Sequence, residues 1–386
     1  MRLSSRAAAP DAHAPVTTLE LFFYLVFVFV VTQLTDLVLE SHGAAGYLEA
    51  FVMLWVIWWM YDGFAWLSNN VGPTTTSTRV PMLLGMAGFL VIAISVPDAF
   101  GEDRWVFAAA YLVTGVVHSV SFLRSSLGES ASAILAIAPI NLGIVAGLFL
   151  AAALPESWRW VGWMLSALLP VASMAFRTEA RFTIRPAHFA ERHRLMLIIA
   201  LGESVLAIGR SAQGHLREAD FLVAVLLAMA LIGLLWWVHF ADDASLERVE
   251  EVVERAEGMP GRTALLSFSM GYLILVAGLV LVAAGVHEAV HDPSHHLSWR
   301  VALTMSAGAA IYLVGNVFYL WRLGVGHRRW FAVTAVLALV VAPVGHVVTG
   351  TAQVAALVLV LLVSLLPVVR DQRTRAAIGE ASTTSG

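Results

Sequence analysis

The chain contains no cysteine and no lysine, and charged residues make up only 13% of its 386 residues. Without cysteine it has no disulfide, no thiolate metal ligand and no thiol nucleophile. Without lysine, Schiff-base and lysine-nucleophile chemistry are also excluded. The formal net charge of −4 gives no basic excess of the kind that binds nucleic acid. We therefore expect no nucleic-acid partner and no cofactor.

Hydrophobic sequence dominates instead. The hydrophobic fraction is 59% and the mean hydropathy is +0.80, whereas a soluble domain carries about 25% charged residues. Roughly a dozen apolar stretches follow one another, each long enough to cross a hydrocarbon core of about 30 Å as a helix. The sequence predicts an all-α polytopic transmembrane helical bundle in a lipid bilayer. Its expected spans, about 12, are residues 19–39, 47–68, 80–97, 104–123, 131–153, 158–176, 189–210, 219–241, 263–286, 299–321, 330–348 and 351–369.

The arginine residues predict the topology. With twelve spans, 18 of the 23 arginines fall on the side that holds both chain ends, and five fall on the other side. Arginine is enriched on the cytoplasmic side of membrane proteins. We expect a multi-pass protein of the bacterial inner membrane with cytoplasmic N- and C-termini. Pro343 predicts a kink in the eleventh span, and Thr349-Gly350 predicts a tight turn after it.

The chain divides into two predicted halves of six spans each. An arginine-rich polar segment separates residues 1–178 from residues 179–386. Six spans is an even number, so the halves would share one orientation, as in some transporters. The largest cytoplasmic loop, residues 241–262, has apolar residues at helical spacing and predicts an amphipathic connector helix.

Two weak echoes favour a duplication. Glu20 opens the first span and Glu191 opens the seventh, and polar pairs follow each of them twelve residues later: Thr32-Gln33 and Glu203-Ser204. A Trp-Trp pair followed by aspartate occurs in the second and eighth spans. Chance similarity between apolar segments is the alternative explanation.

Glu203 is the clearest ionisable group within a predicted span, and such groups normally face other helices or water. Ser204 follows it, and Gly202 is expected to let a neighbouring backbone approach. Arg192 and Arg210 lie 11 and 7 residues away, within about 20° of Glu203 on a helical wheel, which we expect to be too distant for direct pairing. Glu203 either lines a solute or proton path, or is a hydrogen-bonded carboxyl that fixes helix packing.

Other polar residues also interrupt the spans. Asp62 follows the Trp pair of the second span, and Gln33 lies in the polar second half of the first span. Lone intramembrane histidines and asparagines usually join helices by hydrogen bonds. Together these residues predict an interior that is not wholly dry.

An H-E-x-x-H motif spans His287 to His291 at the end of the ninth span. On a helix the two histidines would share a face and could bind zinc, with Asp292, His295 or His296 as third ligand. A proline two residues after the motif ends the helix, and no soluble domain is available to hold a substrate. The motif has three interpretations: a zinc site formed by His287, His291 and His295, the active site of a hydrolase, or a plain polar loop.

Two long motifs resemble one family. ELFFYLVFVFVVTQLT, from Glu20 to Thr35, is similar to the opening signature of the bacterial low temperature requirement protein A family. HFAERHRLMLIIALGESVLAIG, from His188 to Gly209, is similar to its second signature. The resemblance implies a multi-pass bacterial membrane protein named for a growth phenotype in the cold, and it implies no substrate.

The resemblance also points to site residues: Glu20, Glu191, Arg192, His193 and Glu203 match the signatures. Helix capping is the alternative role for the two glutamates that open spans, because a carboxylate complements the helix dipole there. The chain departs from the family pattern in two places, with Tyr24 where the pattern has aspartate and Arg194 where it usually has glycine.

Three functions stay open at this point. The first is a transporter or channel for a cation or small polar solute, with Glu203 near the middle of the path and Asp62 and Glu191 nearer the cytoplasmic mouth. The second is a non-transporting membrane factor that supports envelope or lipid homeostasis in the cold. The third is an intramembrane metal-dependent enzyme, for which only the histidine cluster argues. Neither the substrate nor the oligomeric state is encoded visibly.

Overall fold

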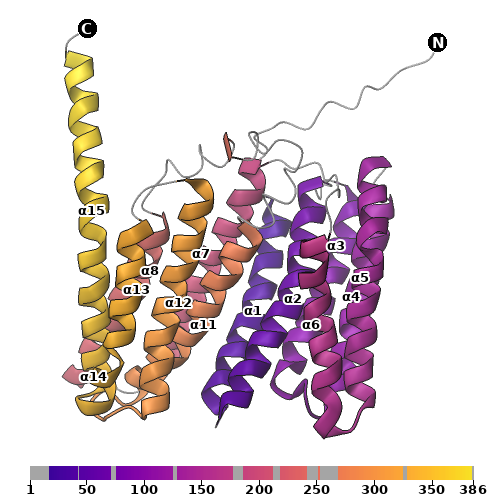
Figure 1. Cartoon of the computed structure of the whole chain (residues 1–386), viewed down its shortest axis with the longest axis horizontal. Helices are drawn as coiled ribbons and strands as arrows, with labels where there is room; N and C mark the ends of the chain where they lie inside the picture. Colours follow the sequence, from indigo (N-terminus) through magenta and orange to yellow (C-terminus); the bar gives the residue numbers. More distant parts are fainter. Residues whose placement is uncertain are drawn as a thin grey trace.

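The protein is a bundle of long helices in the computed structural model (Figure 1), and the described residues contain no β-strand. The predicted connector at residues 241–262 lies outside the described residues apart from a short helical piece, and it stays a prediction. The structure describes residues 17–41, 43–70, 75–124, 128–176, 186–211, 218–240, 251–252, 268–324 and 328–384.

The helices follow the predicted spans closely, because each begins near the polar residues that bound an apolar run. Those from the first part of the chain are α1 (Thr18–Glu40), α2 (Ala44–Asn70), α3 (Thr76–Ser95), η1 (Val96–Asp98), α4 (Arg104–Arg124), α5 (Gly128–Ala153), η2 (Glu156–Trp158) and α6 (Arg159–Phe176). Those from the second part are α7 (Pro186–Ser211), α8 (Ala219–Phe240), α11 (Met270–His291), α12 (Trp299–Leu323), α13 (Arg328–Val340), α14 (Ala342–Val347) and α15 (Gly350–Thr384).

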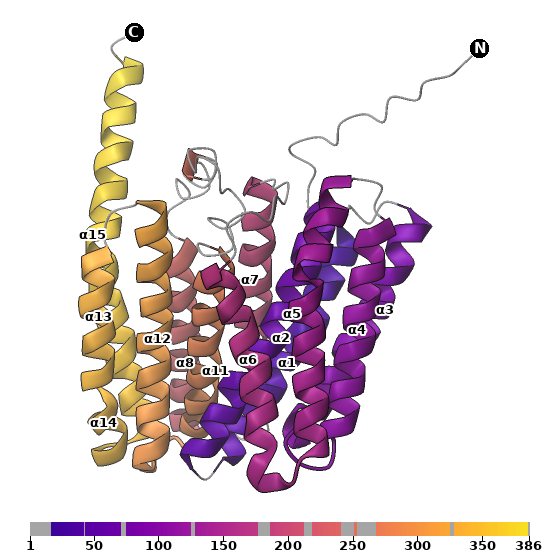
Figure 2. The ribbon, with the colours of Figure 1, turned by 45° about the vertical axis from the view of Figure 1, so that its right-hand side comes forward.

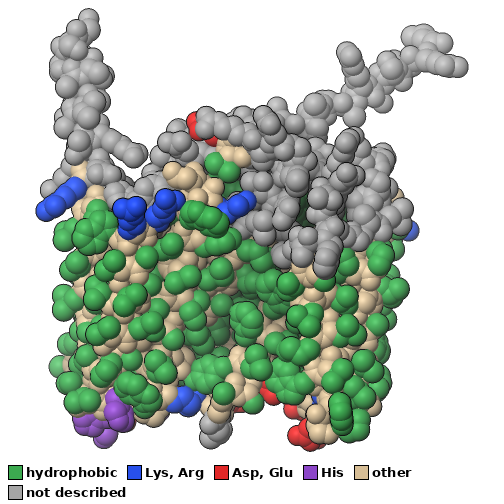
Figure 3. All heavy atoms as spheres, viewed as in Figure 1, with side chains coloured by type: hydrophobic (Ala, Val, Ile, Leu, Met, Phe, Trp, Pro, Cys, Tyr) green, Lys and Arg blue, Asp and Glu red, His purple; other side chains and the backbone are tan. Residues whose placement is uncertain are grey.

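The surface of the bundle is apolar in the way a membrane requires. Within the described residues, nine helices are long and apolar enough to span a bilayer, with α13 and α14 together counted as one. Hydrophobic side chains cover the face in Figure 3, with arginines along one edge and histidines at the opposite edge. So large an exposed apolar surface marks contact with lipid in a folded protein. The prediction of an all-α polytopic transmembrane bundle is confirmed.

The last two spans of the chain differ from single uninterrupted helices of span length. The eleventh span breaks into α13 and α14 at Val341, and Pro343 lies in the first turn of α14, as predicted. The last helix was predicted to end at residue 369, but α15 continues to Thr384 and projects past the bundle (Figure 1). It does so on the side of the bundle where α1 begins.

Helix packing repeats along the chain. α1 packs on α3 as α7 packs on α11, α3 on α4 as α11 on α12, and α2 on α6 as α8 on α15. The Tyr111 hydroxyl donates to the Val56 carbonyl at 3.0 Å, joining α4 to α2. The Tyr312 hydroxyl donates to the Leu235 carbonyl at 3.0 Å, joining α12 to α8 in the same way. Figures 1 and 2 show α1–α6 on one side of the bundle and α8, α12, α13 and α15 on the other.

The two groups of helices meet at α1, which packs on both α7 and α11. α1 and α7 begin at the same end of the bundle (Figure 1). Residues brought together by these helices therefore come from opposite parts of the sequence. Two of the polar residues that the sequence singles out, Glu20 of α1 and Arg192 of α7, meet at this contact.

Candidate functional site

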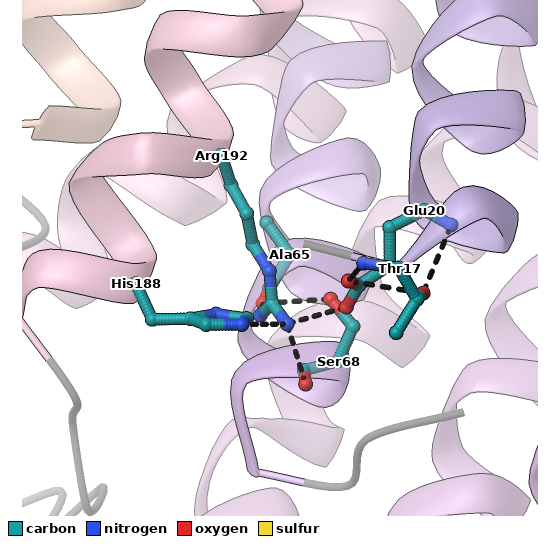
Figure 4. A network of polar contacts seen from close by, with 6 residues as sticks. All are labelled: Thr17, Glu20, Ala65, Ser68, His188 and Arg192. Atoms are coloured by element: carbon teal, nitrogen blue, oxygen red, sulfur yellow. Dashed lines mark hydrogen bonds and ion pairs between the residues drawn. The ribbon is translucent and has the colours of Figure 1, made fainter. Parts of the chain in front are cut away.

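Glu20 lies in the first turn of α1, where it has two roles. Its Oε2 accepts a hydrogen bond from the Thr17 backbone N–H at 2.8 Å, and the Thr17 hydroxyl accepts one from the Glu20 N–H at 3.4 Å. This reciprocal arrangement is a capping box. The other carboxylate oxygen, Oε1, accepts a hydrogen bond from Arg192 Nη2 of α7 (Figure 4). Capping is therefore confirmed for Glu20, together with an ion pair with Arg192, whereas the first turn of α7 has no acidic residue and Glu191 does not cap that helix.

Arg192 is buried, and its guanidinium joins three helices. Nη1 donates to the Ala65 carbonyl at 3.1 Å and Nη2 donates to the Ser68 carbonyl at 2.9 Å, both near the C-terminus of α2. His188 Nε2, one turn earlier on α7, lies 3.5 Å from Nη2. A cation is favoured where the last carbonyls of a helix are unpaired, and a carboxylate is favoured where a helix begins. Arg192 thus pairs with a carboxylate at the start of α1 and also donates hydrogen bonds to two carbonyls at the end of α2.

Asp62 and His193 form a second pair beside the first. The Trp66 indole N–H donates to Asp62 Oδ2 at 3.1 Å, one turn along α2. His193 Nε2 of α7 lies 3.4 Å from Asp62 Oδ1, and both side chains are buried. His193 Nδ1 lies 2.9 Å from the Phe189 carbonyl oxygen. We call Glu20, Asp62, Arg192 and His193 the proximal cluster, because it lies toward the end of the bundle where α1 and α7 begin.

Two tyrosine hydroxyls near the proximal cluster lack hydrogen-bond partners among the described residues. Tyr24 and Tyr61 are fully buried, with ring centroids 6.3 Å apart. The Tyr61 hydroxyl is within electrostatic reach of Asp62 and Arg192. Leaving a buried polar group unpaired costs about 1–3 kcal/mol, so such groups normally meet water or a ligand.

Glu203 lies in the other half of α7, and its surroundings correct two expectations. Arg210 Nη2 donates to Glu203 Oε1 at 2.9 Å, although a separation of seven residues was expected to prevent pairing. Side chains of a helix lean toward its N-terminus, which lets the long arginine reach back two turns. A Cβ atom added at Gly202 would have no neighbour within 4 Å, so this glycine does not mediate close packing. The Glu203 side chain is 17% exposed and that of Arg210 is 55% exposed.

Further polar groups gather near Glu203 from three helices. Asp36, near the end of α1, is within electrostatic reach of Glu203, Arg210 and His287. The Ser211 hydroxyl of α7 lies 2.8 Å from His287 Nδ1 of α11. We call Asp36, Glu203, Arg210, Ser211 and His287 the distal cluster. It lies at the opposite end of the α1–α7 contact from the proximal cluster and is more open to the surroundings.

An apolar layer separates the two clusters. Phe27 and Val31 of α1 and Met196, Leu197 and Ala200 of α7 are all buried. Protein interiors pack at crystal-like density, so a layer of this kind is a barrier to ions and polar solutes. The described structure is closed between the clusters.

Other predicted site residues do not join either cluster. Glu191 is exposed, because the helix turns by about 100° between it and Arg192. Ser204 is buried, and its hydroxyl donates to the Ala200 carbonyl of its own helix at 3.5 Å. Gln33 is half-buried on α1, between the apolar layer and Asp36.

The predicted zinc ligands are only partly brought together. His287 and His291 share a face of α11, with parallel rings whose centroids are 6.2 Å apart. His295 Nδ1 instead lies 2.6 Å from Asp292 Oδ1. Within the described part of the chain, no three His, Asp or Glu side chains are close enough together to hold a metal ion. The motif therefore provides a histidine pair without its predicted third ligand.

Sequence reasoning missed a buried histidine in the second part of the chain. His239 Nδ1 lies 2.9 Å from Asn316 Oδ1, and its Nε2 lies 3.0 Å from the Tyr272 hydroxyl. Both ring nitrogens are thus hydrogen-bonded, which suits a neutral imidazole that joins α8, α11 and α12. Trp66 and His188 were also missed, although each stands one helical turn from a residue that had been singled out, Asp62 and Arg192 respectively.

Fold and site together define a multi-pass helical membrane protein with a buried charged cluster where its two groups of helices meet. The chain belongs to the bacterial low temperature requirement A (LtrA) family, which it matches over residues 15–366. The resemblance of its two motifs to that family is thereby confirmed. The chain is 25% identical to an uncharacterized protein of Rhizobium meliloti (strain 1021) over 313 aligned residues. The aligned region covers 78% of this chain and 75% of that protein. No solved structure matches the chain.

Proposed function

We propose that this protein is a transporter for a small cation or polar solute, and that its path follows the α1–α7 contact. The observation that carries the proposal is the placement of two polar clusters at opposite ends of one pair of helices. The distal cluster is open, whereas the proximal cluster is buried and lies beside two tyrosine hydroxyls that have no hydrogen-bond partner among the residues the structure describes. Ionisable residues within a membrane are costly and usually mark ion or solute pathways.

The apolar layer gives this transporter its barrier. A solute that enters at the distal cluster meets Phe27 and Leu197, and it reaches Asp62 only if α1 and α7 move apart there. Movement of one helical group against the other around a fixed site is how many transporters alternate access. The Glu20–Arg192 ion pair would hold the proximal end closed while the distal end is open.

The distal cluster favours a cation. It holds two carboxylates, Asp36 and Glu203, against one arginine, Arg210. Clefts lined by an excess of one charge concentrate ions of the opposite sign and speed their entry. This excess supports a cation over an anion as the transported species.

The transporter would consist of two related halves, residues 1–178 and 179–386, in one orientation. The repeated packing of helices and the matching tyrosine hydrogen bonds from Tyr111 and Tyr312 support this arrangement. The excess of arginine on the side of the proximal cluster supports a cytoplasmic location for that end and for both termini, in the bacterial inner membrane.

Uptake by liposomes that contain the Glu203→Gln variant tests the proposal. The substitution removes a carboxylate and leaves Arg210 unpaired, so the distal cluster loses its negative excess. A polar contact between the Glu203 carboxylate and an entering cation involves charged groups, and such contacts are worth about 1.5–3 kcal/mol. We therefore expect the initial rate of cation uptake to fall by about tenfold or more when this contact is lost. The measurement is uptake of radiolabelled monovalent and divalent cations, amines and sugars into proteoliposomes of the full chain.

Glu102→Gln is the matched control. Glu102 is an exposed carboxylate in the turn before α4 and belongs to neither cluster, so its loss should leave uptake unchanged. If wild type, both variants and protein-free liposomes take up every solute equally, the transporter proposal is wrong. A non-transporting role in envelope or lipid homeostasis would then be the better description.

A further inference from the structure

The hydrogen bond of His193 Nδ1 determines which form its ring takes. Nδ1 lies 2.9 Å from the Phe189 carbonyl oxygen, and a carbonyl oxygen only accepts hydrogen bonds. Nδ1 therefore carries a hydrogen. In a neutral imidazole the other nitrogen, Nε2, then has a lone pair and no hydrogen.

That lone pair faces a carboxyl group. Nε2 lies 3.4 Å from Asp62 Oδ1, and neither atom has another hydrogen-bond partner among the described residues. An ionised carboxylate is also an acceptor only, so a neutral His193 and an ionised Asp62 would place two acceptors against each other. One added proton removes this conflict, whether it makes an imidazolium or a protonated Asp62. The second oxygen, Oδ2, is engaged by Trp66, which directs a carboxyl proton to Oδ1.

We propose that Asp62 and His193 together bind one proton and that this pair is the proton-coupling site of the transporter. The inference rests on the proposed transport function and names its coupling ion. Both side chains are sealed from the surroundings, so the proton exchanges only when the helices around the pair separate. His239 provides the contrast, since both of its nitrogens already have partners and it needs no added proton.

The charges around the pair determine what can replace the proton. Glu20 and Arg192 neutralise each other, so the protonated pair leaves the proximal cluster with no net charge. Loss of the proton would leave one uncompensated negative charge in an apolar interior, which is strongly unfavourable. The charged and titratable side chains around the pair come from α1, α2, α4, α7 and α11: Glu20, Tyr24, Tyr61, His118, His188, Arg192 and Tyr272.

A cation that enters the site would relieve that cost. The hydroxyl oxygens of Tyr24 and Tyr61, which have no hydrogen-bond partner in the described part of the chain, and the Oδ1 atom of Asp62 are oxygen donors suited to a small hard cation. When a monovalent cation arrives one proton leaves, so charge is balanced in that exchange, whereas a divalent cation would leave the cluster with one positive charge. The transporter would thus exchange a proton for a cation, with both competing for Asp62.

Proton release tests this site without any measurement of transport. The full chain in detergent micelles is held in weak buffer with a pH-sensitive dye, and sodium, potassium or magnesium chloride is added. N-methylglucamine chloride controls for ionic strength. Wild type should release about one proton per molecule with at least one of the metal cations. Asp62→Asn and His193→Gln should release none, and melting curves show that the variants tested are folded.

Two matched controls and a second measurement separate the site from the function. Glu102→Gln and His296→Gln, which alter exposed groups, should release protons like wild type. Release that persists in both Asp62→Asn and His193→Gln, or no release with any cation, overturns the site. Release that depends on Asp62 in a protein that transports nothing into liposomes overturns the proposed function and leaves the site. Cation uptake that is the same with and without a pH gradient, and the same in Asp62→Asn, overturns the site and leaves the function.

Discussion

Arg192→Ala is expected to lower the free energy of unfolding by about 3–5 kcal/mol, the cost of leaving one partner of a buried ion pair without the other. The Glu20 carboxylate would stay buried without a counter-ion, and the Ala65 and Ser68 carbonyls would lose their donors. Melting temperature in detergent, followed by tryptophan fluorescence, measures the effect. We expect little folded protein to be recovered.

A second variant separates loss of charge from loss of packing. In Glu20→Gln with Arg192→Gln the uncompensated charge is gone, so part of the lost stability should return, as a double-mutant cycle would show. Arg329→Ala, which removes an exposed arginine at the start of α13, is the control and should melt like wild type. If Arg192→Ala melts like this control, the ion pair does not hold the helices together.

Gly308→Val should be as damaging, for a steric reason. A Cβ atom at Gly308 of α12 would lie 2.5 Å from the Val282 backbone N and 2.8 Å from the Gly278 carbonyl oxygen of α11. The contact is reciprocal, because a Cβ at Gly278 would lie 2.5 Å from the Tyr312 backbone N. Backbone atoms cannot move aside as side chains do. Overpacking typically costs about 1–3 kcal/mol, and here the two helices must separate along their length, so we expect at least the upper figure.

Gly233→Ala is the matched control for this prediction, and the opposite sign is expected. A Cβ at Gly233 of α8 would have no neighbour within 4 Å. Alanine is favoured over glycine in a helix by about 1 kcal/mol, so this variant should melt at the same or a higher temperature than wild type. Size-exclusion profiles and melting curves compare the folded state and the melting temperature of Gly308→Val with those of Gly233→Ala. Equal melting of both would mean that α11 and α12 are not in backbone contact.

The fold could be predicted well from the sequence, because length and hydropathy alone locate a membrane-spanning helix. The break at Val341 was also within reach, since Pro343 cannot continue a helix without losing a hydrogen bond. The continuation of α15 from residue 370 to Thr384 could not be found in this way. That segment is polar, so it carries no hydropathy signal, and its helix simply extends a preceding one.

The site could be predicted as a set of residues but not as a set of contacts. Glu20, Asp62, Arg192 and His193 were all singled out, yet the residues of the Glu20–Arg192 pair are 172 positions apart, and no local pattern links them. For Glu203 and Arg210 the error was of another kind. The distance along the helix axis overstates their separation, because the long arginine side chain leans toward the N-terminus of the helix.

The residue Glu191 shows a third kind of limit. It resembles Glu20 in its place at the start of a span, and the resemblance suggested an equivalent role. In the structure Arg192 points inward and its neighbour Glu191 is exposed. Only one residue on this turn of α7 can face α1, and which one does so depends on how the helices dock.

The capping box at the start of α1 is local and needs only Thr17 and Glu20, so it can form as soon as the ribosome has delivered that turn to the membrane. Arg192, which forms the ion pair with Glu20, is synthesised much later. Throughout the insertion of α2 to α6 this carboxylate, and the carbonyls at the end of α2, must stay hydrated at the membrane surface. The carboxylate and the carbonyls can become buried only when α7 is inserted. We therefore expect α1 and α2 to reach their final positions late, after the nascent chain has passed its midpoint.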